Sequence, residues 1–298
     1  VELGLRAIPS SWILQETERV PNIDAYMDAL KRARDEWPFT MGWIDCLSRG
    51  SGLGRGIIYR GRWAEPGEAP DAPPKPKMRV TMPFDFPGFV LGPLTVRIFN
   101  ALLFHKHPRR VARGVVHPET FFYPLDMILK WNRMYGRRGF TQHQCVLPEA
   151  AGRVAVRRFL ELLTSLGGAS FLCVIKDCGP EGDGILSFPM HGTSIALDVP
   201  VRRHTQQLVD QLNAFVIQHG GRIYLTKDSF TRPEDFRAME PRLERFQEIR
   251  RRWDPTGRLR SAQSVRVLGD SASAPPTPAA ALPAPAAAPI DQAPDPTR

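Results

Sequence analysis

The sequence is poor in cysteine: its 298 residues contain four, Cys46, Cys145, Cys173 and Cys178. No two of them form a C-x-x-C pair, which excludes the usual spacing of a zinc ribbon or of a thioredoxin-type redox site. We therefore expect four reduced thiols, buried as small apolar side chains in a reducing compartment.

Long apolar runs are also absent from the sequence. No stretch approaches the roughly 18 to 20 residues that an α-helix needs to cross a bilayer. The N-terminus shows no basic segment followed by an apolar one, the pattern of a signal peptide. These absences predict a cytoplasmic protein, with peripheral contact at the inner face of the membrane left open. The opening VELGLRAIPS has the pattern of a strand, so we expect the sequence to begin within a larger protein.

Positive charge, by contrast, is in excess, with a net charge of +9 and a pI of about 9.8. Lys and Arg gather in residues 106–113 and 242–252. Solvated faces explain such clusters as well as an anionic partner does, and phosphate, nucleic acid and acidic lipid are all such partners. No RNP, helix-turn-helix or zinc motif accompanies the charge, so the sequence argues against nucleic acid.

Helical and strand-like patterns alternate along the chain. Residues 22–36 place apolar side chains at the i, i+3, i+4, i+7 spacing of a helix face, with Asn22 as N-cap. Because the elements follow no regular βαβ rhythm, the sequence predicts an α+β fold with a largely antiparallel sheet flanked by helices. Further helices are expected at 149–166, 203–221 and 231–253, and strands at 39–49, 57–61, 170–179, 184–190, 193–201 and 222–226.

Four segments fall outside this pattern. The glycine-dense residues 50–56 lack the G-x-G-x-x-G register and precede a strand, so we expect a loop between antiparallel strands and not a dinucleotide site. The Pro-rich residues 64–77 predict an exposed, mobile loop. Residues 86–106 are apolar and end in basic residues, which suits either a partly buried helix or one that docks on lipid. The Ala/Pro-rich residues 269–298 predict a disordered tail.

Several longer blocks resemble a known enzyme family. They are HPETFFYPLDMILKWNRMYGRRGFTQHQCVLP (117–148), the segment from YLTKDS (224–229) to DPTGRL, and, in the same order as in that family, FTMGWIDCLSRG, LSFPM and TSIALDVP. Together they resemble the flavoenzymes of the vanillyl-alcohol-oxidase type, and among these the decaprenylphosphoryl-ribose oxidases that form the FAD subunit of an epimerase. The resemblance covers roughly residues 1–268.

The resemblance implies FAD as cofactor and a division of the chain. Residues 1–219 match the substrate-binding (cap) domain, and residues 220–268 match the C-terminal segment that completes the FAD-binding domain. The N-terminal half that holds the FAD pyrophosphate and adenine in this family has no counterpart here. We therefore expect the chain on its own to bind FAD poorly.

The same resemblance places Lys227 beside the isoalloxazine ring, as both a catalytic and a cofactor-binding residue. A fixed cation there stabilises the negative charge that hydride transfer to N5 leaves on the ring, and it can hydrogen-bond the reacting hydroxyl. Tyr224 matches an aromatic position that lines the same site. Asp228 and Ser229 are expected to fix the corner between strand and helix. An exposed lysine at a strand end is the alternative for Lys227.

The remaining site residues match the substrate pocket. Gln142 and Gln144 alternate on a strand, so both face one side and can bind sugar hydroxyls, whereas His143 faces the other side and is expected to be structural. Lys176 matches a pocket lysine suited to phosphate. Arg133 matches a residue near the pocket mouth, although a salt bridge that holds its helix is an equal alternative.

The sequence departs from the family in the pocket wall. Members carry a cysteine at the position of Ala196, an asparagine at Ser194 and a phenylalanine at Cys178, which leaves the exact substrate open. The resemblance implies oxidation of a secondary alcohol of a polyprenylphosphoryl pentose to a keto sugar, followed by an NAD(P)H-dependent reductase that completes an epimerisation. A sugar-1,4-lactone oxidase of the same superfamily, or a non-catalytic fragment without its flavin domain, are the alternatives.

Overall fold

A computed structural model of the chain describes residues 2–5, 7–75, 79–88, 90, 92–168, 170 and 172–270. The tail expected to be disordered lies outside the described residues from position 271 onwards, and so do residues 76 and 77 of the Pro-rich loop.

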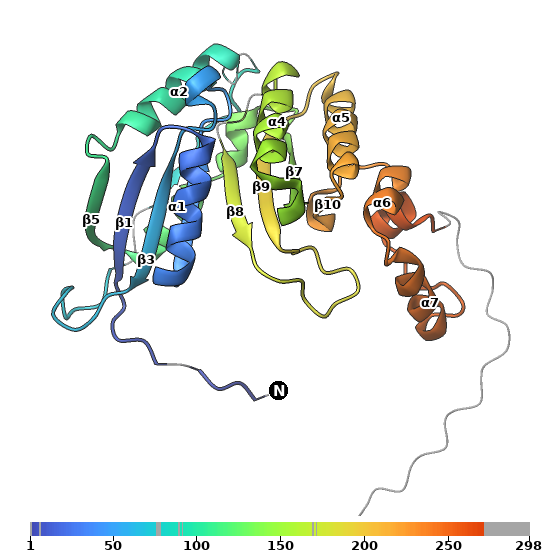
Figure 1. The fold of residues 1–298 in the computed structure, drawn as a ribbon, viewed down its shortest axis with the longest axis horizontal. Coiled ribbons are helices and arrows are strands. Elements are labelled where there is room, and N and C mark those ends of the chain that lie inside the picture. Colours follow the sequence, from blue (N-terminus) through green and yellow to red (C-terminus); the bar gives the residue numbers. More distant parts are fainter. Residues whose placement is uncertain are drawn as a thin grey trace, which may run out of the picture.

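The strands form two four-stranded sheets and a short parallel pair (Figure 1). Their bounds are β1 (Ile13–Val20), β2 (Phe39–Ile44), β3 (Gly56–Trp63), β4 (Val80–Thr81), β5 (Val111–Val116), β6 (Ile128–Leu129), β7 (Phe140–Pro148), β8 (Cys173–Cys178), β9 (Gly192–Pro200) and β10 (Arg222–Ile223). The first sheet has the order β2-β3-β1-β5 and the second β10-β7-β9-β8, and every pairing within them is antiparallel. The two sheets adjoin where β2 lies beside β8.

Helices α1 and α4 lie in front of the sheets in Figure 1, and α5 lies beside α4, where it contacts β7 and β10. The helices are α1 (Ile23–Glu36), α2 (Pro93–His105), α3 (Pro118–Phe122), α4 (Gly152–Ser165), α5 (Thr205–Gln218), α6 (Pro233–Met239) and α7 (Leu243–Trp253). Asn22 caps α1 as expected, because its side chain accepts a hydrogen bond from the backbone N–H of Ala25 at 3.0 Å. Phe159 and Leu163 of α4 are fully buried in a core that also takes in Cys145 and Ile195 of the second sheet. Helices α4 and α5 therefore cover one face of the second sheet and leave its other face uncovered by these helices.

The turn after α5 sets the course of the segment that carries Lys227. Gly220 has φ +67, the left-handed region that favours glycine, and the N–H of Gly221 donates to the carbonyl of Val216 at 2.9 Å. A side chain on Gly221 would press its Cβ to 2.5 Å from the carbonyl oxygen of Val146 on β7. The glycine pair thus lets β10 run directly alongside β7.

Several sequence-based expectations are correct at this level. The antiparallel sheets flanked by helices confirm the expected α+β fold, while the assignment to a two-domain flavoenzyme stays a prediction. The glycine-dense residues 50–56 lie between the antiparallel strands β2 and β3, as expected. All four cysteines are free thiols, three of them buried and Cys178 half-buried.

Other expectations are wrong. Residues 184–190 form turns and irregular backbone and not a strand, and the described part of the opening decapeptide is also irregular, since the first strand begins at Ile13. The strand expected at 222–226 ends at Ile223, because the chain turns in a short 3₁₀ segment at Leu225–Lys227. Residues 184–190 and the opening decapeptide alternate in polarity, but neither pairs with a strand in the described structure.

The helix expected at 231–253 is two helices. Between α6 and α7 the backbone leaves the helical conformation at Glu240, because Pro241 disfavours helical geometry in the residue before it. The expected capping box at Thr231 does not form, since Arg232 is the N-cap and no side chain caps α6. Phe236 and Met239 nonetheless pack into the same core as the sheets, and the domain boundary at residue 219 stays a prediction.

None of the helices in the described part of the chain combines the length and the apolar character needed to cross a bilayer.

Candidate functional site

The face of the second sheet turned away from α4 and α5 carries polar side chains. Gln142 on β7 lies opposite Asp198 on β9, and Gln144 lies opposite Ala196. On the other side of β9, Lys176 of β8 lies opposite Ser194. Residues directly opposite in an antiparallel pair point to the same face, and alternate residues of one strand share it. The strand register therefore brings together residues that lie far apart in the sequence.

A chain of hydrogen bonds runs across this face to Lys227. The Lys227 ammonium donates to Gln142 Oε1, and Gln142 Nε2 donates to Asp198 Oδ1 at 2.7 Å. Tyr135 Oη donates to Asp198 Oδ2 at 2.7 Å. The arrangement joins an ammonium, an amide, a carboxylate and a phenol in one line.

The carboxylate of Asp198 is buried, with 1 % of its surface exposed. Burial raises the pKa of Asp198, and the hydrogen bonds from Gln142 and Tyr135 and the charge of Lys227 oppose that rise. Burial, followed by the proximity of Asp198, raises the pKa of Tyr135. The phenol is therefore a hydrogen-bond donor at neutral pH, and it helps to hold the carboxylate in place.

The ammonium of Lys227 contacts a neutral side chain and forms no ion pair within the described part of the chain. Within the described residues no carboxylate lies at salt-bridge distance from its ammonium, which instead contacts the neutral amide of Gln142. An ammonium has three donors, so two remain for a bound molecule. The positive charge at this face is thus not cancelled by a direct ion pair.

The backbone around Lys227 is firmly fixed. The N–H of Tyr224 donates to the carbonyl of Gln144 at 2.8 Å, and the N–H of Lys227 donates to the carbonyl of Tyr224 at 2.8 Å. Asp228 is buried and accepts hydrogen bonds from Arg266 at 2.6 Å and from Gln263 at 3.0 Å. Asp228 therefore fixes the corner after Lys227, as the sequence indicated.

The other residues expected on β7, β9 and β10 gather around the same face. Gln144 Nε2 donates to the buried Ser194 Oγ at 3.1 Å, and Ala196 is half-buried between them and Asp198 along β9. The ring of Tyr224 packs on Phe188, with 4.7 Å between the centroids. The side chains of these residues therefore line the sheet face next to the end of the Lys227 side chain.

Lys176 and Arg133 are placed differently from this group. Lys176 is exposed on β8, two strands away from Gln144. The Arg133 guanidinium donates to the backbone carbonyls of Met82 at 2.9 Å and Pro83 at 2.8 Å. It fastens the segment before α2 to the residues around Tyr135, and these carbonyls take the place of the salt bridge considered from the sequence.

A groove of about 700 Å³ opens beside Tyr135. Aromatic and apolar groups line part of it, and the rest is lined mainly by exposed basic side chains, with the exposed Asp85 at one side. Its lining includes Phe86, Pro87, Met134, Tyr135, Arg137, Arg138, Arg202, Arg203 and His204. An amphipathic molecule with an anionic group would match this combination of surfaces.

His143 points to the opposite face, as expected. Its Nε2 lies 3.1 Å from Asn213 Oδ1 on α5, and its ring stacks on Phe159 of α4 with 6.1 Å between the centroids. Burial lowers the pKa of His143 to about 4, which keeps the imidazole neutral at physiological pH. His143 is therefore a structural residue under the site.

Sequence reasoning missed Asp198 and Tyr135. Asp198 follows Ser194 and Ala196 at the period of two, so the alternation of β9 alone could have assigned it to the same face. Tyr135 lies in a 3₁₀ segment at Trp131–Tyr135, and the sequence pattern of this segment does not indicate the direction of its side chains. Its role emerges only from the fold.

Comparison with known proteins confirms the resemblance seen in the sequence blocks. Decaprenylphosphoryl-β-D-ribose oxidase of Mycolicibacterium smegmatis is 33% identical over 240 residues, which cover 78% of this chain and 51% of that protein. A Streptomyces coelicolor protein described as an "uncharacterized protein in mprA 5'region" is 28% identical over 269 residues, covering 85% of this chain and 72% of that protein. The chain thus spans about half the length of the mycobacterial oxidase. No protein-family model matches the chain.

Proposed function

We propose that this chain forms the substrate-facing part of an FAD-dependent oxidoreductase that oxidises a secondary alcohol of a polyprenylphosphoryl pentose to a keto sugar. The observation that carries the proposal is the ammonium of Lys227, which is held by Gln142 on a polar sheet face and has no carboxylate partner in the described structure. The similarity to decaprenylphosphoryl-β-D-ribose oxidase supports the substrate class.

The donor groups present fit the ring of a flavin and not its phosphates. A cation with two unused donors suits the electron-rich edge of the ring, and the aromatic Tyr224 lies three residues before it. A pyrophosphate needs a glycine-rich turn that leads into a helix N-terminus. The glycine-dense residues 50–56 lead into strand β3 instead.

Each residue of the face has a distinct task in this proposal. FAD, when bound, would supply the two-electron acceptor at its N5. Lys227 holds a positive charge where negative charge develops during the reaction, and it donates a hydrogen bond to the reacting hydroxyl. Gln142 orients Lys227, while Gln144, a buried residue whose Nε2 donates to Ser194 Oγ, would offer its amide oxygen to a sugar hydroxyl.

The phosphate of the substrate requires cations at some distance from Lys227. Lys176 is exposed at the same sheet face, and the groove beside Tyr135 carries four exposed arginines on its lining. Arginine binds phosphate oxygens through paired N–H donors, and the apolar part of the groove suits a prenyl chain. The keto sugar product would pass to an NAD(P)H-dependent reductase, which would complete an epimerisation.

A stopped-flow experiment on the intact, flavin-loaded enzyme tests the proposal. Lys227→Ala should slow the anaerobic reduction of the flavin by polyprenylphosphoryl ribose about 10²- to 10³-fold, the loss typical of one preorganised donor. Substrate affinity should change less, and Lys227→Arg should restore only part of the rate because the charge moves. The control is Lys130→Ala, at an exposed residue that has a left-handed backbone conformation (φ +56).

The outcomes separate the competing functions. A wild-type rate for Lys227→Ala would show that the lysine takes no part in the reaction. Faster reduction by an aldonolactone than by the prenyl substrate would make the protein a sugar-lactone oxidase. Absence of reduction by either substrate in flavin-loaded wild-type enzyme would support a non-catalytic chain.

A further inference from the structure

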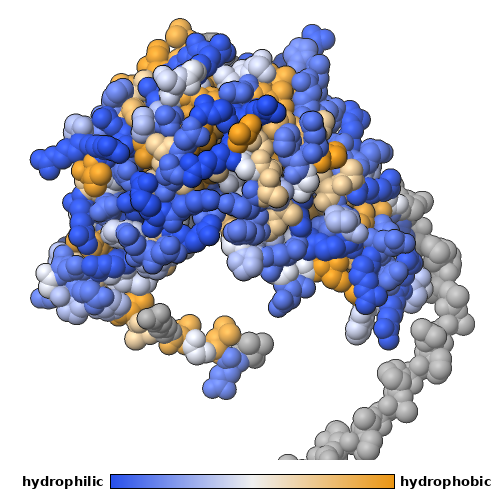
Figure 2. All heavy atoms as spheres, in the orientation of Figure 1, coloured by the Kyte–Doolittle hydropathy of each residue, from blue (hydrophilic) through white to orange (hydrophobic). Residues whose placement is uncertain are grey.

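Helix α2 presents apolar side chains to solvent, the reverse of an ordinary surface helix. Leu94, Ile98 and Leu102 follow one another at intervals of four residues, so they form one stripe along the helix. They are 70 %, 53 % and 69 % exposed, and Phe99 beside them is 47 % exposed. Figure 2 shows apolar surface along the upper edge of the molecule, where Figure 1 places α2. A surface helix normally turns such a stripe towards the core.

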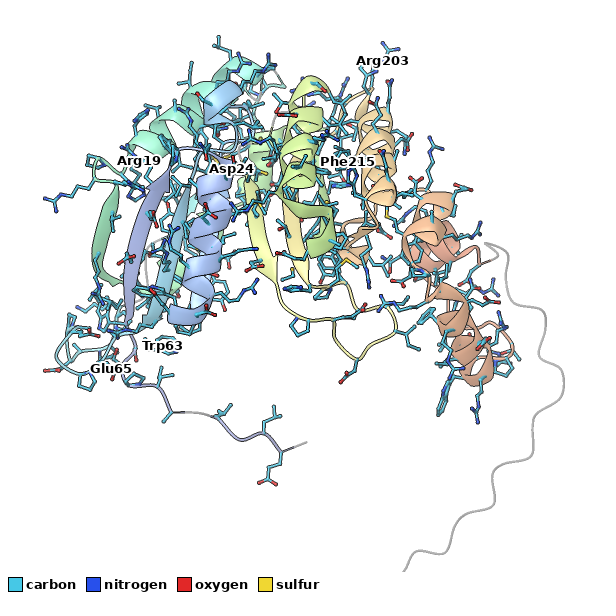
Figure 3. All side chains as sticks on the ribbon, viewed as in Figure 1. Arg19, Asp24, Trp63, Glu65, Arg203 and Phe215 are labelled. Atoms are coloured by element: carbon cyan, nitrogen blue, oxygen red, sulfur yellow. The ribbon has the colours of Figure 1, made fainter. Side chains whose placement is uncertain are left out.

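The inner side of α2 is anchored by the buried Val96 and by contacts of Asn100 and Phe104, which fix the direction of the apolar stripe. Asn100 is fully buried, and its Nδ2 donates to Asp45 Oδ1 at 2.8 Å. The ring of Phe104 lies between two guanidinium groups, 5.1 Å from Arg19 and 4.8 Å from Arg55. Figure 3 labels Arg19 on β1, whose upper end α2 covers. Turning the helix to bury its leucines would break these contacts.

Positive charge surrounds the exposed stripe. Residues 92–113 contain no Asp or Glu, and Arg97, Lys106, Arg109 and Arg110 in this segment are all exposed. Arg203, before α5, points away from the fold at the same upper end of the molecule (Figure 3). This end of the protein therefore combines an apolar stripe with a cationic rim.

We propose that α2 and the basic turn that follows it, residues 106–110, dock on the surface of an anionic phospholipid bilayer. A helix that lies in the interface buries an apolar face among the acyl chains and sets Lys and Arg against the headgroups. A second copy of this chain is a poorer occupant, because a symmetric dimer through α2 would bring two basic rims together. The inference does not depend on the proposed activity, since binding to lipid needs no turnover.

Vesicle flotation tests the docking surface directly. The wild-type chain should float with vesicles of phosphatidylcholine containing about 30 mol% phosphatidylglycerol and bind much less to pure phosphatidylcholine, and high salt should weaken the binding. The triple variant Leu94→Gln, Ile98→Gln, Leu102→Gln should bind the anionic vesicles at least about tenfold more weakly. Arg109→Gln with Arg110→Gln should reduce the binding to anionic vesicles without touching the apolar stripe.

A matched control uses two other exposed apolar residues on a basic surface. Trp253 and Leu259 are 82 % and 72 % exposed near the end of α7, and Trp253→Gln with Leu259→Gln should leave binding unchanged. Circular dichroism and thermal melting of each variant verify that the fold is intact. Wild-type binding by the folded triple variant, or loss of binding in the α7 control alone, would overturn the proposal. The proposal would also be overturned if the wild-type chain formed a dimer that does not bind vesicles and the triple variant were monomeric, because the stripe would then be a protein interface.

Discussion

Replacement of His143 should change how the stability of the fold depends on pH. Burial lowers the pKa of His143 to about 4, against 6.5 for an unfolded histidine. Between about pH 6.5 and about pH 4, His143 therefore binds a proton in the unfolded chain but not in the folded chain. The stability from a neutral His143 is complete above pH 6.5 and is lost progressively as the pH falls towards 4.

The size of the effect follows from the same two values. The folded and unfolded pKa values of His143 differ by 2.5. This difference corresponds to a loss of roughly 3 kcal/mol in the free energy of unfolding once the pH is below both values. Between about pH 7.5 and about pH 5, the wild-type free energy of unfolding should fall by about 2 kcal/mol on account of His143 alone. Urea denaturation followed by circular dichroism measures this directly, because two-state unfolding returns the free energy at each pH.

The informative comparison is between the pH slopes of two proteins and not their absolute stabilities. His143→Gln keeps an amide that can hydrogen-bond to Asn213 but removes the titrating ring, so its loss of stability on acidification should be smaller by about 2 kcal/mol. His191→Gln, at an exposed position, is the control for removal of an imidazole. If wild type and His143→Gln lost stability in parallel, the buried imidazole would not remain neutral, and its assignment as a structural residue under the site would be wrong.

Two further predictions concern the site face. In the intact enzyme, Lys176→Ala should raise KM for a phosphorylated substrate more than it lowers kcat, and an unchanged KM would remove Lys176 from the site. Tyr135→Phe leaves one oxygen of the buried Asp198 without its donor, so the free energy of unfolding in urea should fall by about 1 to 3 kcal/mol. A loss too small to measure would show that water replaces the phenol.

The sequence predicts the helices and the polar face of the second sheet well where the spacing of apolar and polar residues follows one regular period. The apolar stripes of α1 and α4 are long and regular, and Asn22 supplies a cap, so both helices lie within a few residues of their expected bounds. The alternation in β7 likewise separates Gln142 and Gln144 from His143 correctly. These outcomes depend on local geometry, which a single strand or helix carries within itself.

The errors arise where a distant partner decides the outcome. Residues 184–190 have strand-like alternation, yet the carbonyl of Ser187 accepts from Arg222 at 2.8 Å and from Arg242 at 3.1 Å, contacts with side chains in place of a neighbouring strand. Helix α2 illustrates the same limit: its apolar residues predict a helix, but only the contacts of Asn100 and Phe104 show which side faces the core. Periodicity gives the faces of an element, and packing decides which face is inside.

The contact between Lys227 and Gln142 shows how such distant partners can set the chemistry of a site. A carboxylate only accepts hydrogen bonds and an ammonium only donates them, so an amide between the two satisfies both in a single orientation. Asp198 thus fixes the Gln142 side chain with its N–H₂ towards β9 and its oxygen towards Lys227. Because the carboxylate acts through a neutral amide, it positions the ammonium without forming a direct ion pair that would cancel its charge. The pairing of β7 with β9 therefore gives Lys227 a fixed position and leaves its positive charge without a direct ion pair at the polar face of the sheet.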